Sequence, residues 1–549
     1  MATTTIDSGD RLDRSPIGER LDRPSHPLAR ALFGLGLIGG LGYAAYSIFL
    51  DTQHVGETLA LGVFAFLGLA LLIALAFEFV NGFHDTANAV ATVIYTNSMP
   101  APLAVVWSGV WNLIGVLLSS GAVAYSIVTL LPVDLILHVG SSAGFAMIFS
   151  LLFAAVIWNL ATWYFGIPNS SSHALIGSIL GVGFANQLIS AGTGGTQGVD
   201  WGQAQKVLSS LLFSPLMGFF GALLLLVVMK LVLRNPKLYQ APEGDAPPPT
   251  GIRALLIFTC TAVSFAHGGN DGQKGMGLIM LILIGCAPTA YALNRTMPAS
   301  DTPAFVQHAS AAAAVFHRHA EGTPIGPEAA REALTSALKT RNASTPVVYA
   351  AIETVTNEIS HDVGSYGSLS KIPSAAASNL RNDMYLVLDT SRLATKAKTA
   401  SQTFSADELK TVDTYQTGLE KSTRYIPLWV KVTVAIALGL GTMVGWRRIV
   451  VTVGERIGKT HLTYGMGAAA ELTAASTILL AEYVGAPVST THILTSGVAG
   501  ASVGNGAGLQ PRTIRNMVLA WVLTLPAAML IAGGLYWGML TVIRAMGTV

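Results

Sequence analysis

Long apolar runs recur along the chain at the length needed to cross a lipid bilayer. Such runs occupy residues 30–50, 57–80, 101–131, 143–165, 207–233, 253–266, 275–293, 426–446, 462–484 and 516–543. A membrane-spanning helix needs about 20 predominantly apolar residues, and hydrocarbon requires every backbone polar group to be paired within the protein. The sequence therefore predicts an all-α polytopic membrane protein with about 10–12 transmembrane helices.

The composition agrees with this class. Of the 549 residues, 51% are hydrophobic and 11% are charged, whereas soluble domains carry about 25% charged residues. The net charge of +2 gives no reason to expect a nucleic-acid partner. Cys260 and Cys286 both lie in apolar segments, which indicates core packing with neither a disulfide framework nor a metal-ligand spacing. We expect a multi-pass protein of the plasma (inner) membrane, with the lipid bilayer as its surroundings.

Polar stretches divide the chain into segments. Residues 1–28 alternate Arg and Asp with Pro and Gly, which predicts a disordered tail. Residues 294–425 are polar, with nearly balanced charge and helical patterns such as "GPEAAREALTSALKTR", and predict an extramembrane helical insert without catalytic features. The other expected segments are a first transmembrane repeat (29–237), a Pro-rich linker (238–252), the first part of a second repeat (253–293) and its remainder (426–549).

An aspartate motif occurs twice. "FVNGFHDTANA" (79–89) aligns with "FAHGGNDGQKG" (265–275) so that Asp85 coincides with Asp271, and one Phe and one Gly also coincide. Both cores have the form G-x-[HN]-D. Chance agreement is improbable because a second pair of motifs follows in the same order.

A serine/threonine element is also duplicated. "YFGIPNSSSHAL" (164–175) aligns with "YVGAPVSTTHIL" (483–494), and the Tyr, Gly, Pro, Ser, His and Leu positions coincide. Duplicated halves in which polar motifs interrupt apolar segments indicate a secondary transporter, with broken helices or re-entrant hairpins and a binding site near the bilayer midplane. The residues alone do not give the number of crossings in each repeat, which decides whether the repeats are inverted.

The serine/threonine elements favour an oxyanion. Each opens with Pro, which suits the first turn of a helix, and a helix start offers unpaired N–H groups and positive dipole. Neighbouring hydroxyls add donors, so two such starts would surround a tetrahedral anion without a buried cation. The alternative is that the hydroxyls bond to their own helix or mark tight turns. The six candidates are Ser170, Ser171, Ser172, Ser489, Thr490 and Thr491.

The negative charges of Asp85 and Asp271 would repel a bound anion unless a proton or a cation neutralises them. Each carboxylate would accept a hydrogen bond from a protonated phosphate oxygen, or would hold a proton or cation that travels with the anion. Either arrangement predicts symport. The alternative is an Asp that caps a broken helix while Asn81 and Asn88 satisfy backbone groups.

Other polar residues in apolar surroundings are candidates for coupling. Lys274 is not among the coupling candidates; it follows Asp271 by three residues on one helical face, which predicts either a pair with Asp271 or a direct contact with the substrate. His84 and His267 could relay protons or serve as buried structural histidines. Glu471 lies in an apolar span, and its counterpart in the first half is a leucine. An unmatched acid in a membrane segment is a coupling candidate by default.

The motifs "NGFHDTANAVATVIYT", "WYFGIPNSSSH", "FAHGGNDGQKG" and "PVSTTH" resemble those of the inorganic phosphate transporter (PiT) family, above all its bacterial low-affinity PitA-type members. The similarity extends over both membrane halves. The resemblance implies a bundle of twelve or a similar number of helices in inverted repeats, and functional roles for His267 and Glu471. It also implies that phosphate is held by Asp85, Asn88, Asn270, Asp271 and the six hydroxyls named above.

The same resemblance implies proton coupling and phosphate entry as a neutral complex with a divalent metal. His84 stands where many members have Asn, and Asn112 stands where sodium-coupled members often carry Glu. Both fit the proton-coupled branch. A sodium-coupled phosphate symporter and a divalent-metal or sulfate carrier remain alternatives. We expect no enzyme activity, no resident cofactor or metal, and phosphate and a coupling cation as partners. Whether the chain forms a homo-oligomer is left open.

The motifs disfavour two other classes of protein, a nucleotide-driven pump and an intramembrane hydrolase. "GGNDGQKG" lacks the G-x-x-x-x-G-K-[ST] spacing that a nucleotide-driven pump would need. "GSSAG" (140–144) matches a hydrolase elbow, but it has no strand–turn–helix context.

Overall fold

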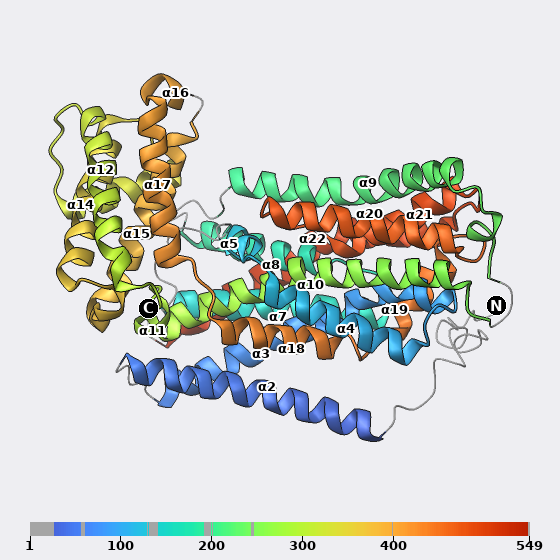
Figure 1. Cartoon of the computed structure of the whole chain (residues 1–549). Coiled ribbons are helices and arrows are strands. Elements are labelled where there is room, and N and C mark those ends of the chain that lie inside the picture. The colour runs from blue at the N-terminus through green and yellow to red at the C-terminus, as the bar shows by residue number, and fades with distance from the viewer. Residues whose placement is uncertain are drawn as a thin grey trace, which may run out of the picture.

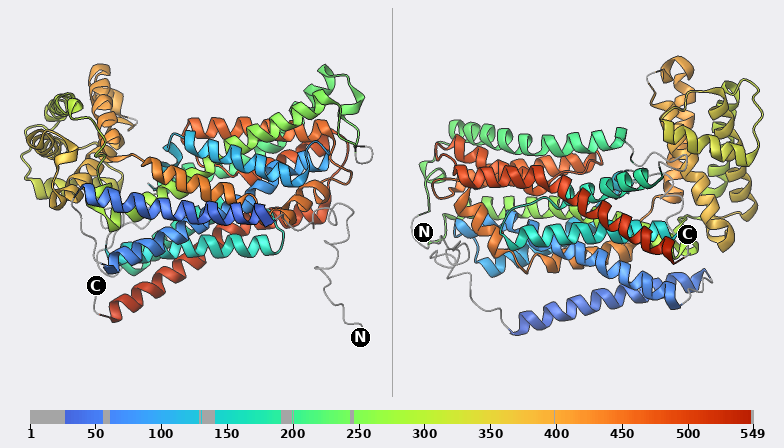
Figure 2. Two further views of the ribbon diagram at one scale, coloured as in Figure 1. Left: turned by 60° about the horizontal axis from the view of Figure 1, so that its bottom comes forward. Right: turned by 180° about the vertical axis from the view of Figure 1, so that it is seen from behind.

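The computed structural model describes residues 27–55, 61–128, 130, 141–190, 199, 201–242, 246–397 and 399–546. This described part is helical, with one isolated bridge between Gly458 and Leu509 and no strand. Figure 1 shows long helices lying side by side and a separate group of shorter helices at one end of them. Both views in Figure 2 show the same separation.

Eight of the described helices are long and apolar enough to cross a membrane, which confirms the polytopic all-α class. They are α2 (Pro27–His54), α3 (Leu61–Tyr95), α4 (Ala101–Leu118), α7 (Ser142–Tyr164), α8 (Ser171–Ser190), α9 (Trp201–Val232), α10 (Thr250–Cys286) and α22 (Pro511–Ala545). A ninth candidate is the pair α17 (Ala406–Thr423) and α18 (Leu428–Gly441), bent by 68°. The helices α20 (Tyr464–Tyr483) and α21 (Thr490–Gly504) pack in the same bundle but are shorter or less apolar.

The aspartate motifs do not interrupt their helices. α10 runs unbroken through 265–275, so the apolar runs on either side of this motif form one helix rather than two spans. The glycines of this motif let neighbouring helices pack closely against α10. A Cβ on Gly268 would meet the backbone of Asn112 in α4, and one on Gly275 would meet Glu78 in α3.

The serine/threonine elements form the turns of two helical hairpins, α7–α8 and α20–α21. Gly166 and Gly485 take equivalent positions in these turns and adopt φ of 65° and 67°, a left-handed conformation that glycine tolerates best. The residues that open the second helices, Ser170 and Ser489, are buried. The second part of each turn is therefore buried, whereas the first part is exposed at Tyr164, Phe165, Tyr483 and Val484. Re-entry of these hairpins into the membrane stays a prediction.

The two halves pack through equivalent glycines. Gly181 of α8 and Gly500 of α21 each lie eight residues after the histidine of their element. A Cβ on Gly181 would meet the backbone of Met529 in α22, and one on Gly500 would meet the backbone of Phe219 in α9. Each hairpin is thus seated against the last long helix of the other half.

The helices that carry the aspartates are antiparallel where they meet. Glu78 of α3 lies against Gly275 of α10, and Asp85, further along α3, lies near His267, earlier in α10. Inversion of the complete repeats stays a prediction.

The polar segment between α10 and α18 folds around its own apolar core. Its helices are α12 (Thr302–His319), α13 (Pro327–Thr340), α14 (Pro346–Tyr366), α15 (Ser374–Thr395), α16 (Ala400–Thr403) and α17. The backbone N–H of Asn294 donates to the carbonyl of Ser422 at 2.8 Å, so the two ends of the segment meet. The predicted tail lies almost entirely outside the described residues. The remaining short elements are α5 (Ala122–Val128), η1 (Pro236–Leu238), α11 (Pro288–Tyr291), η2 (Ala299–Asp301), η3 (Leu369–Lys371), α19 (Arg447–Val451) and η4 (Thr452–Arg456).

The glycine contacts predict a stability effect. Gly181→Ala and Gly500→Ala should each lower the thermal unfolding temperature of the detergent-solubilised protein, by the equivalent of about 1–3 kcal/mol, because the added methyl meets backbone that cannot rotate away. Gly534→Ala in α22 is the matched control, since nothing lies within 4 Å of its Cβ position. Equal unfolding temperatures for all three variants would contradict this packing.

Candidate functional site

The two aspartates lie together at the contact of α3 and α10. Asp85 is 3% exposed and Asp271 is 0% exposed. Both hairpins deliver hydroxyls to them: Ser171 donates to Oδ2 of Asp85 at 3.0 Å, and Thr491 donates to its Oδ1. Thr490 donates to Oδ2 of Asp271 at 3.2 Å. The structure therefore brings both hydroxyl clusters and both acids, all predicted from sequence, into one place.

The remaining hydroxyls of the two clusters have other partners. Ser170 and Ser489 each accept a bond from the backbone N–H three residues later, at 3.1 Å, and so cap their own helices. Ser172 donates to the carbonyl of Val488 at 2.7 Å and accepts from Lys274. For Ser170 and Ser489 the structure shows the local bonding that was the alternative interpretation. Phosphate contacts of all six hydroxyls stay predictions.

His267 lies between the two acids. Its Nε2 is 3.8 Å from Oδ2 of Asp85 and 3.3 Å from Oδ2 of Asp271. Its Nδ1 is 2.7 Å from Oδ1 of Asn112, and since an amide oxygen only accepts, we assign the proton to Nδ1. Nε2 then donates toward the carboxylates only when the ring is doubly protonated. His84 is a second neighbour, with its Nδ1 3.6 Å from Oδ1 of Asp85.

Lys274 pairs with Asp271, as their spacing predicted. Its Nζ is 2.6 Å from Oδ1 of Asp271, and neither side chain is exposed. Of the two predicted asparagines, Asn270 donates to the carbonyl of Ala486 in the second hairpin turn at 3.4 Å. Asn88 belongs to α3, but its side chain lies outside the described residues. Roles of both asparagines in binding stay predictions.

Glu471 is buried but lies away from this cluster. Thr259 of α10 donates to its Oε2 at 2.5 Å. Thr259 precedes Asp271 by twelve residues of one helix, which is about 18 Å along the axis. Thr92 of α3, whose side chain also interacts with Glu471, follows Asp85 by seven residues, which is about 10 Å along the axis. The structure therefore does not bring Glu471 into contact with the aspartates, and a coupling role would act from a second position.

Two polar residues at the cluster are missing from the site that the sequence predicted. Asn112 orients His267, and Glu78 lies near Lys274 and Asp271 with no exposed surface. The signal that could have found both is simple: each is a lone polar residue in an apolar run, and buried polar residues in membrane segments are functional candidates by default.

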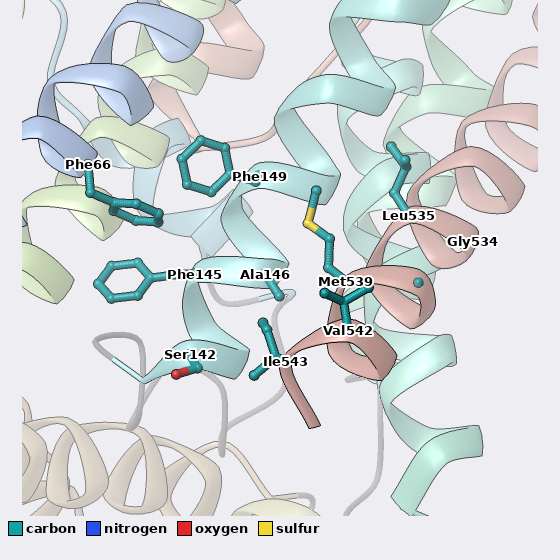
Figure 3. Close-up of a pocket in the computed structure, with 11 residues that line it drawn as sticks. Phe66, Ser142, Phe145, Ala146, Phe149, Gly534, Leu535, Met539, Val542 and Ile543 are labelled. Atoms are coloured by element: carbon teal, nitrogen blue, oxygen red, sulfur yellow. The ribbon is translucent and has the colours of Figure 1, made fainter. Parts of the chain in front are cut away.

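An apolar cleft among the described residues lies elsewhere. It has a volume of about 580 Å³ and is lined by α3, α7 and α22, with Phe66, Phe145, Phe149 and Met539 among its walls (Figure 3). No charged side chain lines it. Ser142 is the one hydroxyl among its lining residues, which is too few donors for an oxyanion, so the aspartate cluster remains the candidate site.

A bundle of membrane helices built from two related halves, with acids and helix starts buried between them, is typical of a membrane transporter. Residues 81–532 match the model of the phosphate transporter family, so this chain belongs to that family. Over 493 residues it is 43% identical to the low-affinity inorganic phosphate transporter PitA of Escherichia coli (strain K12), covering 86% of this chain and 96% of the relative.

Two further similarities are found. The chain is 40% identical to the low-affinity inorganic phosphate transporter PitB of the same strain, over 87% of this chain and 98% of the relative. It is 19% identical to a solved structure described as the sodium-dependent phosphate transporter, with a TM-score of 0.47 over 87% of this chain and 100% of that chain.

The contribution of the hydrogen bond between Asn112 and His267 to stability can be measured. Asn112→Leu should destabilise the protein by about 1–3 kcal/mol, because Nδ1 of His267 loses its acceptor inside the bundle. Thermal unfolding in detergent measures this loss. Asn357→Leu on the exposed face of α14 is the control and should change stability by less than about 0.5 kcal/mol. An unfolding temperature for Asn112→Leu equal to that of the control would show that the bond contributes nothing.

Proposed function

We propose that this chain is a secondary active transporter that imports inorganic phosphate, and that Asp85, Asp271 and the hairpin hydroxyls around them form its binding site. The observation that carries the proposal is the convergence of hydroxyls from both hairpins on two buried acids. The relatives named as low-affinity inorganic phosphate transporters support the choice of anion.

The helix starts of α8 and α21 supply what phosphate needs. The first N–H groups of a helix have no partner within it, and their dipole favours an anion. Ser171, Thr490 and Thr491 donate to the carboxylates. Phosphate oxygens would compete with those carboxylates for the same donors. Entry of the anion therefore requires a positive charge near the acids, because unrelieved repulsion in a low dielectric is costly.

A proton is the coupling ion that the neighbouring side chains favour. His84 and His267 both approach Asp85, and a second proton on His267 would link both acids. Histidine is the side chain whose protonation changes near neutral pH. Sodium coupling is the alternative that an uptake experiment has to exclude.

A divalent metal would enter as part of the cargo. Asp85, His267 and Asp271 each offer one ligand atom, and these atoms lie within 4.8 Å of one another. Carboxylates and imidazole suit a divalent ion, so a neutral metal–phosphate complex fits the same cluster. This observation supports metal–phosphate as the substrate. A carrier of free metal or of sulfate is the rival.

Removing the charge of Asp85 should stop transport. For Asp85→Asn we expect uptake of radiolabelled phosphate into proteoliposomes to fall to the level of protein-free vesicles, since the acid that takes the coupling charge is lost. Asp413→Asn, on the exposed face of the insert, should keep the parent rate. Gel filtration and thermal unfolding check that both variants fold. Retained uptake by Asp85→Asn, or parent uptake of sulfate or of metal without phosphate, would refute the proposal.

Imposed gradients identify the coupling ion. An inward proton gradient should drive phosphate accumulation by the parent protein and an inward sodium gradient should not, because histidines flank Asp85. Magnesium should stimulate uptake if the metal complex is the cargo. Accumulation driven by sodium alone at constant pH would establish the sodium-coupled alternative.

A further inference from the structure

The two halves of the site differ at one equivalent position. The residue three places after the aspartate is Asn88 in the first half and Lys274 in the second. Of the described residues of the membrane bundle, Lys274 is the one lysine or arginine that is fully buried. A buried ammonium is costly unless it is paired, so its partners indicate its purpose.

Lys274 joins the acid of its own half to a hydroxyl of the other half. Its Nζ is 2.6 Å from Oδ1 of Asp271 and donates to Oγ of Ser172 in α8. Glu78 lies nearby on α3. Asp85 has a different environment, with hydroxyl donors from Ser171 and Thr491 and two histidines, but no described lysine or arginine.

Equivalent acids therefore carry unequal charge compensation. Asp271 has a cation that is covalently part of the protein and cannot leave with the cargo. Asp85 has only neutral hydroxyls and histidines, whose charge depends on bound protons. We propose that Lys274 is a tethered cation that occupies the place of one co-transported cation, so that only Asp85 takes a positive charge from solution with each phosphate. This inference rests on the proposed phosphate symport and specifies how that site sets its cation requirement.

Replacement of Lys274 by asparagine, the residue at the equivalent position of the first half, tests this proposal. Lys274→Asn leaves Asp271 without its partner, and removal of one partner from a buried pair strongly disfavours the charge that remains. Phosphate uptake by this variant should become dependent on an added monovalent cation such as Na⁺ or Li⁺, with stimulation on the order of tenfold. Currents recorded from proteoliposomes should show one more positive charge moved per phosphate than in the parent.

Lys230→Asn is the matched control. Its Nζ donates to the carbonyl of Gly504 at the end of α21, away from the aspartates, so the cation dependence of uptake should equal that of the parent. The proposal is overturned if Lys274→Asn transports phosphate with the parent's cation dependence and charge per phosphate.

A double variant covers the case in which the single variant fails to fold. Lys274→Asn with Asp271→Asn removes the cation and the acid together. It should bind phosphate more weakly, because a site residue is lost, but with the cation dependence of the parent. A folded double variant that requires an additional cation would count against the proposal.

The parent protein gives a readout that needs no variant. The coupling cations taken up per phosphate, counted apart from any divalent metal bound to it, should number one, because a single acid takes its charge from solution. Two such cations per phosphate would refute the tethered-cation role. Absence of phosphate uptake by the parent would instead refute the proposed function, so the two failures are distinguishable.

Discussion

The closeness of Asp85 and Asp271, whose carboxylate oxygens lie within 4.8 Å of each other, is the constraint on which the surrounding structure depends. Two carboxylates in a low dielectric need donors and positive charge close by. Glycines on α10 let neighbouring helices approach these acids, since a Cβ at Gly268 or Gly275 would collide with α4 or α3. The hairpins α7–α8 and α20–α21 then bring hydroxyls and helix starts to the same depth. Polar backbone that would be costly against lipid is placed where it surrounds the acids.

Duplication explains why donors from distant parts of the chain meet. Ser171 and Thr490 occupy equivalent positions, and each donates to the aspartate of its own half. The equivalent histidines His173 and His492 lie against each other, with ring centroids 4.5 Å apart. Such paired contacts are what a twofold relation between the two halves would produce, and that relation stays a prediction. Thr491 departs from it, because it crosses to Asp85 while its counterpart bonds a backbone carbonyl. Such departures give the two acids different hydrogen-bond partners, whereas a fully symmetric site would surround both acids in the same way.

Local spacing allowed part of the site to be predicted from the sequence. Lys274 and Asp271 pair because residues three apart on a helix face the same way. The two motif pairs also predicted which hydroxyls lie near which aspartate, because each motif occurs once in each half of the chain. The rest depends on tertiary packing. Which serine caps its helix and which faces the acids depends on the residue at which the helix begins, and Ser170 differs from Ser171 by a single position. The separation of Glu471 from the aspartates depends on where α20 crosses α10, which no spacing in the sequence contains.

The hydrogen bonds between the hairpin hydroxyls and Asp85 bear on how the proposed symport would be coupled. The hydroxyls of Ser171 and Thr491 donate to Asp85, and these bonds stabilise the ionised carboxylate. An anion that takes those hydroxyls leaves the carboxylate without donors and next to a negative charge, which is the state that most needs a proton or cation. The same donors therefore stabilise either the ionised acid alone or the anion together with its positive companion. A site that shares its donors in this way disfavours the half-loaded states, and disfavouring half-loaded states is what couples two solutes in a symporter.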